Sequence, residues 1–69
     1  MIPIQFEYIE DGVLKFVQVL ERFKFHFSDD ILFRVSVQWV SPLTGSPMVR
    51  YSVHTEEEIR TMLETRVDM

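Results

Sequence analysis

The sequence predicts an α+β fold, in which an antiparallel β-meander of about five strands is covered on one face by a single C-terminal α-helix. Apolar and polar residues alternate over most of residues 2–53, which is the period of strands with one buried face. Turn-forming residues interrupt this alternation, and a helical apolar period follows residue 55. The chain has 69 residues, which is the size of a single domain, here 1–69.

The first two strands are predicted to form a tight hairpin. Residues 2–9 alternate strictly, so that Phe6 lies on the apolar side. Asp11 and Gly12 favour a type I′ turn, because both central positions of that turn need positive φ. A two-residue loop then pairs Phe6 with Val17, and the apolar sides of the two strands match.

Residues 13–27 can be interpreted in two ways. Their Val and Phe content, with strict alternation of Phe from 23 to 27, favours strand. We expect a bend or bulge near Leu20 and Glu21 that divides the region into two strands. A helical apolar period is also present over 13–26, and it would give a β-α-β-β-α fold of the ubiquitin-like or PB1-like type.

The last two strands are predicted at 31–40 and 48–53. A three-residue turn at 28–30 sets Phe25 opposite Phe33 in the preceding hairpin. The loop SPLTGSP at 41–47 has turn chemistry throughout. We expect Trp39 to pair with Val49, and the side chains of 49, 51 and 53 to face the core.

The final element is predicted to be an α-helix over roughly 56–67. Thr55 followed three residues later by Glu58 is the signature of a capping box. The apolar stripe that we expect to pack on the sheet consists of Ile59, Met62, Leu63 and Val67.

Two resemblances cover parts of the chain. Residues 31–63, with a Thr-Glu-Glu-Glu-Ile helix start, resemble the C-terminal half of PB1 domains, which pair through charged surfaces, and IQFEYIEDG is similar to their first hairpin. The order of strands followed by a helix is similar to the PC4-type single-stranded DNA-binding coactivators, which are dimers with a basic sheet. The loop SPLTGSP lacks the acidic cluster of PB1 domains, and the lysine- and glycine-rich pattern of PC4-type proteins is also missing. No family is assigned.

One short helix covers one sheet face, so the other face meets water or a partner. One half of this face is predicted to be basic, and the register places Lys24 opposite Arg34. Because like charges so placed repel, an anionic partner between them would explain the arrangement, and a face that meets only water is the alternative. The predicted anion- or partner-binding residues are Arg22, Lys24, His26, Arg34 and Arg50. The other half is apolar, and its predicted oligomer-interface residues are Ile9, Leu14, Phe16 and Leu20.

The expected function is that of a non-enzymatic protein–protein interaction module. We expect it to be homodimeric and to act as an accessory or inhibitory subunit through its uncovered sheet face. The alternative is single-stranded nucleic-acid binding on the basic half of the sheet, although the net charge of −4 argues against a general nucleic-acid coat.

Catalytic residues, metal and cofactor are not expected, because no spacing in the sequence supports a catalytic triad, a phosphate loop or a metal site. The chain has no Cys, and nothing in it resembles a signal peptide or a membrane span. We therefore expect a cytoplasmic protein that does not contact a membrane.

Overall fold

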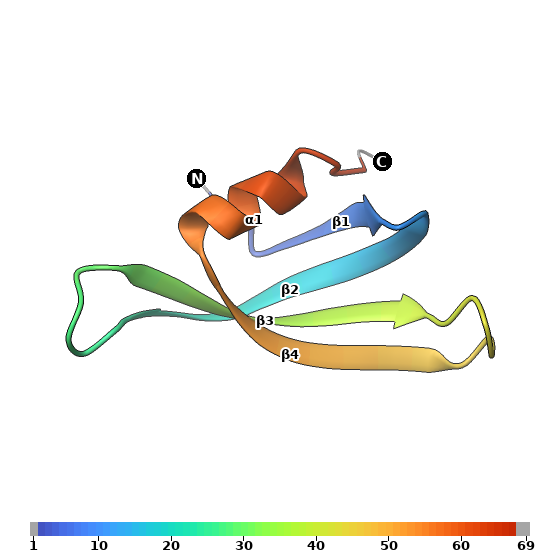
Figure 1. Ribbon diagram of the computed structural model, residues 1–69, viewed down its shortest axis with the longest axis horizontal. Helices are drawn as coiled ribbons and strands as arrows, with labels where there is room; N and C mark the ends of the chain where they lie inside the picture. Colours follow the sequence, from blue (N-terminus) through green and yellow to red (C-terminus); the bar gives the residue numbers. More distant parts are fainter. Residues whose placement is uncertain (1, 68–69) are drawn as a thin grey trace.

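The computed structural model describes residues 2–67 as one sheet and one helix. The elements are β1 (Gln5–Glu10), β2 (Val13–Lys24), β3 (Ile31–Val40), β4 (Pro47–Thr55) and α1 (Glu56–Leu63). The four strands form one antiparallel sheet in the order β1-β2-β3-β4, and α1 lies over one of its faces (Figure 1). The α+β class with a C-terminal helix is confirmed, and the strand count is four rather than five.

The β1–β2 hairpin has the predicted register. Phe6 pairs with Val17, and Tyr8 pairs with Lys15. The turn residue Asp11 has a φ of 53° and Gly12 a φ of 76°, as a type I′ turn requires. Local turn chemistry is therefore enough to set this pairing.

β2 is a single bulged strand. Val19 pairs with Val35, but Glu21 pairs with Arg34, so Leu20 and Glu21 together oppose one residue of β3. The predicted irregularity at this point is confirmed. The strand nevertheless continues to Lys24, so it is not divided in two. The helical alternative for 13–26 is wrong, and so is the β-α-β-β-α fold that depended on it.

The β2–β3 pairing differs from the predicted one beyond the bulge. Phe33 pairs with Arg22 and not with Phe25. Residues 25–30 form a longer loop, in which the Phe25 N–H donates to the Asp30 carbonyl at 3.3 Å. Phe25 and Phe27 are 52% and 89% exposed, so the prediction that their rings face the core is wrong. The reason is that the β2–β3 loop spans residues 25–30 rather than 28–30, so β2 ends at Lys24, before these rings.

The β3–β4 register differs by one residue from the predicted one. Trp39 pairs with Met48 rather than with Val49. The Ser41 N–H donates to the Ser46 carbonyl at 2.9 Å, so the loop closes one residue earlier than the segment 41–47 suggests. A one-residue slip moves every side chain of a strand to the other face. The side chains turned outward by this slip are those of Val49, Tyr51 and Val53.

The core lies between α1 and the middle of the sheet. Val17, Val35 and Val37 are fully buried, and Ile59 of α1 is fully buried against them. The remaining buried apolar residues are Phe6, Tyr8 and Phe33, with Ile2, Val19, Trp39, Met62 and Leu63 partly buried around them. Since α1 carries only one fully buried residue, its attachment to the sheet depends strongly on Ile59.

The predicted capping box is present at the start of α1. The Glu58 N–H donates to Thr55 Oγ1 at 3.2 Å, and the Thr55 N–H donates to Glu58 Oε1 at 2.9 Å. The helix ends at Leu63, earlier than the predicted end at 67. The segment 65–67 instead runs along the free edge of β1, where the Ile9 N–H donates to the Thr65 carbonyl at 3.2 Å.

Candidate functional site

The outer face of the sheet has no covering element within residues 2–67, because α1 packs on the opposite face. On this outer face Ile9 and Leu14 lie directly opposite each other and are 47% and 50% exposed. Phe16, which is half-buried, and Leu20, which is exposed, continue the row along β2. We call these four residues the β1–β2 patch. All the residues predicted for an oligomer interface therefore lie on the uncovered face.

A second apolar strip follows β4, and we call its members Val49, Tyr51 and Val53 the β4 strip. Tyr51, with 67% of its surface exposed, lies opposite Ser36 on the outer face. Val49 and Val53 lie opposite Gln38 and Arg34 on the same face. Two apolar groups thus lie near opposite edges of the sheet, separated by the polar side chains of Gln18, Ser36 and Gln38.

The predicted basic half of the outer face is not formed. Arg34 lies opposite Glu21, and its Nη2 is 3.4 Å from Glu21 Oε2. Lys24 lies opposite Ile31, and its Nζ is 3.4 Å from Asp29 Oδ1. The prediction that Lys24 opposes Arg34 is therefore wrong. The cause is the longer β2–β3 loop, because Lys24 pairs with Ile31 at the base of this loop and Glu21 therefore lies opposite Arg34.

The other predicted basic residues lie elsewhere. Arg22 lies opposite the buried Phe33, which places it on the helix face of the sheet. Arg50 lies opposite Val37 and is on the helix face too. His26 belongs to the β2–β3 loop. The cations are therefore distributed over two faces and a loop, and they do not make one anion-binding surface.

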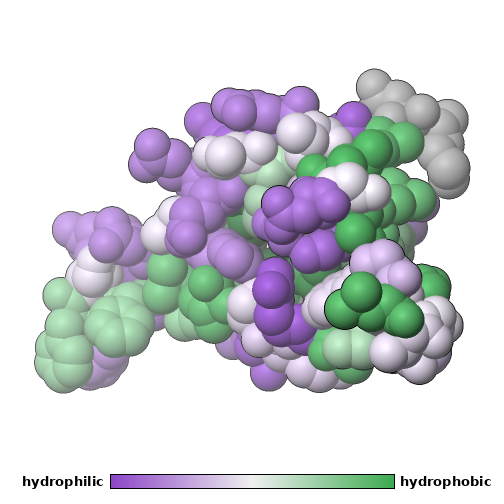
Figure 2. Space-filling model, turned by 45° about the vertical axis from the view of Figure 1, so that its right-hand side comes forward, coloured by the Kyte–Doolittle hydropathy of each residue, from purple (hydrophilic) through white to green (hydrophobic). Residues whose placement is uncertain are grey.

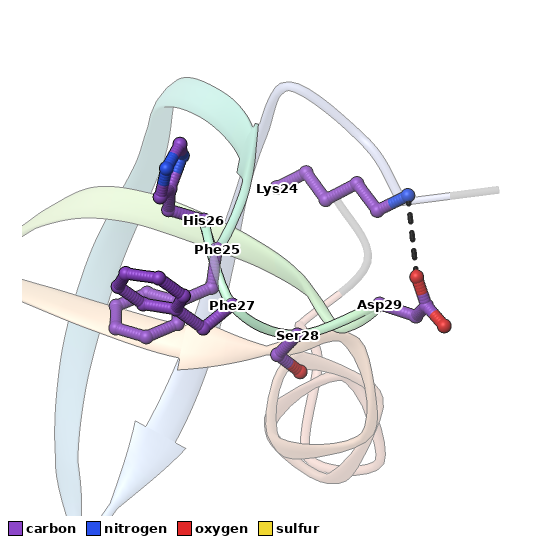
Figure 3. A pocket seen from close by; sticks show the side chains of 6 residues that line it. All are labelled: Lys24, Phe25, His26, Phe27, Ser28 and Asp29. Atoms are coloured by element: carbon purple, nitrogen blue, oxygen red, sulfur yellow. Dashed lines mark ion pairs between the residues drawn. The ribbon is translucent and has the colours of Figure 1, made fainter.

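The β2–β3 loop forms an open pocket at one end of the molecule. Figure 3 shows the Lys24 side chain reaching across this loop to Asp29. The rings of His26 and Phe27 are in edge contact, with centroids 4.8 Å apart. Figure 2 shows hydrophobic surface at the end of the molecule where this loop lies. Arg22 and Lys24 are balanced here by Asp29 and Asp30, so the loop has no excess positive charge at neutral pH.

A polar cluster occupies the helix face beside α1. Lys15 is almost completely buried, and its Nζ donates to Glu10 Oε1 at 2.6 Å. The same Nζ is 4.8 Å from the centroid of the Trp39 ring, and the Arg50 guanidinium carbon is 5.8 Å from it. The hydrogen bond from Lys15 lowers the pKa of the Glu10 carboxyl below its ordinary value. Sequence reasoning missed this cluster, although Glu10 and Lys15 are diagonal neighbours in the predicted hairpin.

The space between β1, β4 and α1 is a pocket of about 260 Å³. Burial raises the pKa of the Tyr8 hydroxyl that lines it. His54 Nε2 is 2.8 Å from Ser52 Oγ, and His54 Nδ1 is 3.8 Å from Glu58 Oε2. The Thr55 backbone N–H holds the pKa of Glu58 below its ordinary value. Ser52, His54, Thr55 and Glu58 thus interact with one another, and no buried side-chain N or O atom among residues 2–67 lacks a partner.

The comparisons add no assignment: no protein-family model, no curated protein and no solved structure matches the chain. Across the described part of the chain, no helix is long and apolar enough to cross a membrane. No group of three or more His, Cys, Asp or Glu side chains in residues 2–67 is arranged to hold a metal ion.

Proposed function

We propose that the chain is a non-enzymatic protein–protein interaction module that forms a homodimer through its uncovered sheet face and serves as an accessory or inhibitory subunit. The observation that supports this proposal is the β1–β2 patch, where Ile9, Leu14 and Leu20 are between 43% and 50% exposed on a face without a covering element. Contiguous apolar patches of this kind on soluble proteins mark interaction sites.

The occupant proposed for this face is a second copy of the chain, packed sheet against sheet. Four strands spaced about 4.8 Å apart and about nine residues long present a face of roughly 19 by 30 Å. This planar area of roughly 570 Å² corresponds to a larger accessible area, so it approaches the ~800 Å² per partner of a standard interface. A domain of this size also buries only about 60% of its unfolded surface, and it therefore gains stability from a partner.

Few charges oppose such an arrangement, and one of them is Glu7, which lies opposite Phe16 on the outer face. Arg34 and Glu21 on the outer face already neutralise each other. The net charge of −4 per chain adds a repulsion between copies that salt screens. We therefore expect the dimer to become tighter as the salt concentration rises, whereas binding through a basic face would become weaker.

The test is a Leu14→Glu substitution followed by sedimentation velocity over a concentration series. Half of the Leu14 surface is exposed and available for burial in the interface. A loss of about 1.4 kcal/mol per copy weakens the dimer about 100-fold, because each copy contributes one such side chain. Leu43→Glu is the matched control, because Leu43 lies in the β3–β4 loop and is 93% exposed. A wild-type chain that stays monomeric at high micromolar concentration would refute the homodimer.

A further inference from the structure

The two edges of the sheet differ in one respect. The edge of β1 is occupied by the chain itself, since the Val67 N–H donates to the Glu7 carbonyl at 2.8 Å and the Ile9 N–H donates to the Thr65 carbonyl. β4 forms the opposite edge, and within residues 2–67 it is paired only with β3. Its nine residues thus have backbone groups that face outward without a strand beside them.

We propose that the edge of β4 binds an extended segment of a partner protein as an additional antiparallel strand, and that this segment has apolar residues at alternate positions and one acidic residue between them. The inference rests on the proposed function as an interaction module and names the chemistry of the partner. It concerns a different surface from the β1–β2 patch. An added strand is held by main-chain hydrogen bonds, while its alternate side chains determine specificity.

The edge of β4 lacks most of the features that protect sheet edges. Proteins block such edges with Lys, inward-pointing charges, bulges or Pro within the strand. β4 contains no Lys, Asp or Glu, its register with β3 is regular, and Pro47 stands at its first position. The β4 strip supplies apolar side chains on the outer face, of which Tyr51 is the most exposed. Apolar residues of an added strand would pair with Val49, Tyr51 and Val53 across the new ladder.

Arg50 is the reason for proposing an acidic residue in the partner segment. It is exposed on the helix face of β4, where, after the hydrogen bond from Lys15, its charge helps to lower the pKa of the Glu10 carboxyl, and none of the ion pairs found among residues 2–67 includes it. Its guanidinium carbon lies over the Trp39 ring, 5.8 Å from the centroid. An acidic side chain directly opposite Arg50 on an added strand would form a favourable cross-strand pair.

The same charge distinguishes a partner segment from a second copy at this edge. The strand sequence PMVRYSVHT contains Arg50 and His54 and no carboxylate. Pairing of β4 with its own copy would therefore place no carboxylate directly opposite Arg50. A partner segment with Glu or Asp at one position and apolar residues at alternate positions can pack against the β4 strip and pair with Arg50.

The probe is the synthetic peptide acetyl-STVTVEVTS-amide, in which the Glu stands opposite Arg50 when three Val residues stand opposite the β4 strip. We expect titration into the full chain to slow hydrogen exchange at alternate β4 amides, measured by NMR. The same peptide with Lys in place of Glu should bind about 2- to 30-fold more weakly, because attraction is replaced by repulsion. Arg50→Gln should remove most of this difference, and Tyr51→Lys should abolish binding while Leu43→Lys leaves it intact.

The result that would overturn the proposal is a peptide that binds without protecting β4 amides, or that does not bind at all. Protection of β4 amides that grows with protein concentration in the absence of peptide would assign the edge to a second copy and would also overturn it. The titration is repeated with the Leu14→Glu variant, in which the substitution in the β1–β2 patch is expected to weaken the dimer. Peptide binding by a monomeric Leu14→Glu chain supports the edge site independently of the dimer. A wild-type chain that forms the dimer but does not bind the peptide refutes the edge site and leaves the proposed homodimer standing.

Discussion

Replacing Ile59 with Ala should remove a large part of the stability of the domain. Ile59 is the one fully buried residue of α1, and it packs on Val17, Val35 and Val37. The substitution deletes three carbon atoms, each contributing about 0.8 kcal/mol when buried, which gives a transfer loss of about 2.4 kcal/mol. The cavity left behind adds to this loss, so we expect a total of about 3 kcal/mol.

Such a loss is large for this chain. Domains of this size have a free energy of unfolding of roughly 3–10 kcal/mol, at about 0.05–0.15 kcal/mol per residue. A change of about 3 kcal/mol corresponds to a fall in Tm of roughly 12–24 °C. Because α1 leads into the segment 65–67, loosening the helix should also release this segment from the edge of β1.

The assay is denaturant unfolding followed by circular dichroism, at one fixed protein concentration because a dimer makes stability depend on concentration. Ile59→Val serves as a graded comparison, with an expected cost of about 0.5–1.5 kcal/mol. If Ile59→Ala costs less than Ile59→Val, or less than about 1 kcal/mol, then α1 does not hold the core as described.

Two further predictions concern ion pairs. Arg34→Glu should destabilise the domain by up to about 1 kcal/mol in denaturant titration, because it places a second carboxylate opposite Glu21. Adding Glu21→Arg to the same chain should restore the lost stability. An Arg34→Glu variant more stable than the wild type would contradict the observed register. The pKa of Glu10 is lowered in the fold, so its pairing with Lys15 stabilises the folded domain at pH values above the ordinary carboxyl pKa. This stabilisation is lost as the pH falls through the lowered pKa. Glu10→Gln should therefore reduce the dependence of the free energy of unfolding on pH in the acid range. The effect should be about 1 kcal/mol at most, because the Glu10 side chain is 43% exposed. The same pH dependence of unfolding in the variant and the wild type would contradict this.

The parts of the fold that were predictable are those governed by local chemistry. The Asp11-Gly12 turn sets the register of the first hairpin, and Thr55 with Glu58 sets the start of α1. Both depend on residues that are close in sequence. The placement of the β1–β2 patch on the outer face follows from the first hairpin, so it was predictable as well.

The remaining registers depend on how longer loops close. The β2–β3 loop closes between Phe25 and Asp30, and the β3–β4 loop closes between Ser41 and Ser46. Neither position is specified by one local signal, yet each changes which side chains face outward. For this reason the basic face predicted from the alternation at 22–27 is not formed, and the apolar β4 strip was assigned to the wrong side.

In the proposed homodimer, the β1–β2 patch of one copy contacts the same patch of the other copy. The most direct measurement is an isotope-filtered NMR experiment on an equal mixture of ¹³C-labelled and unlabelled chain, which detects only contacts between copies. We predict intermolecular NOEs among the side chains of Ile9, Leu14 and Phe16, and their loss in the Leu14→Glu variant. NOEs between copies that involve only the β4 strip, or no such NOEs under conditions where the chain sediments as a dimer, would contradict this arrangement.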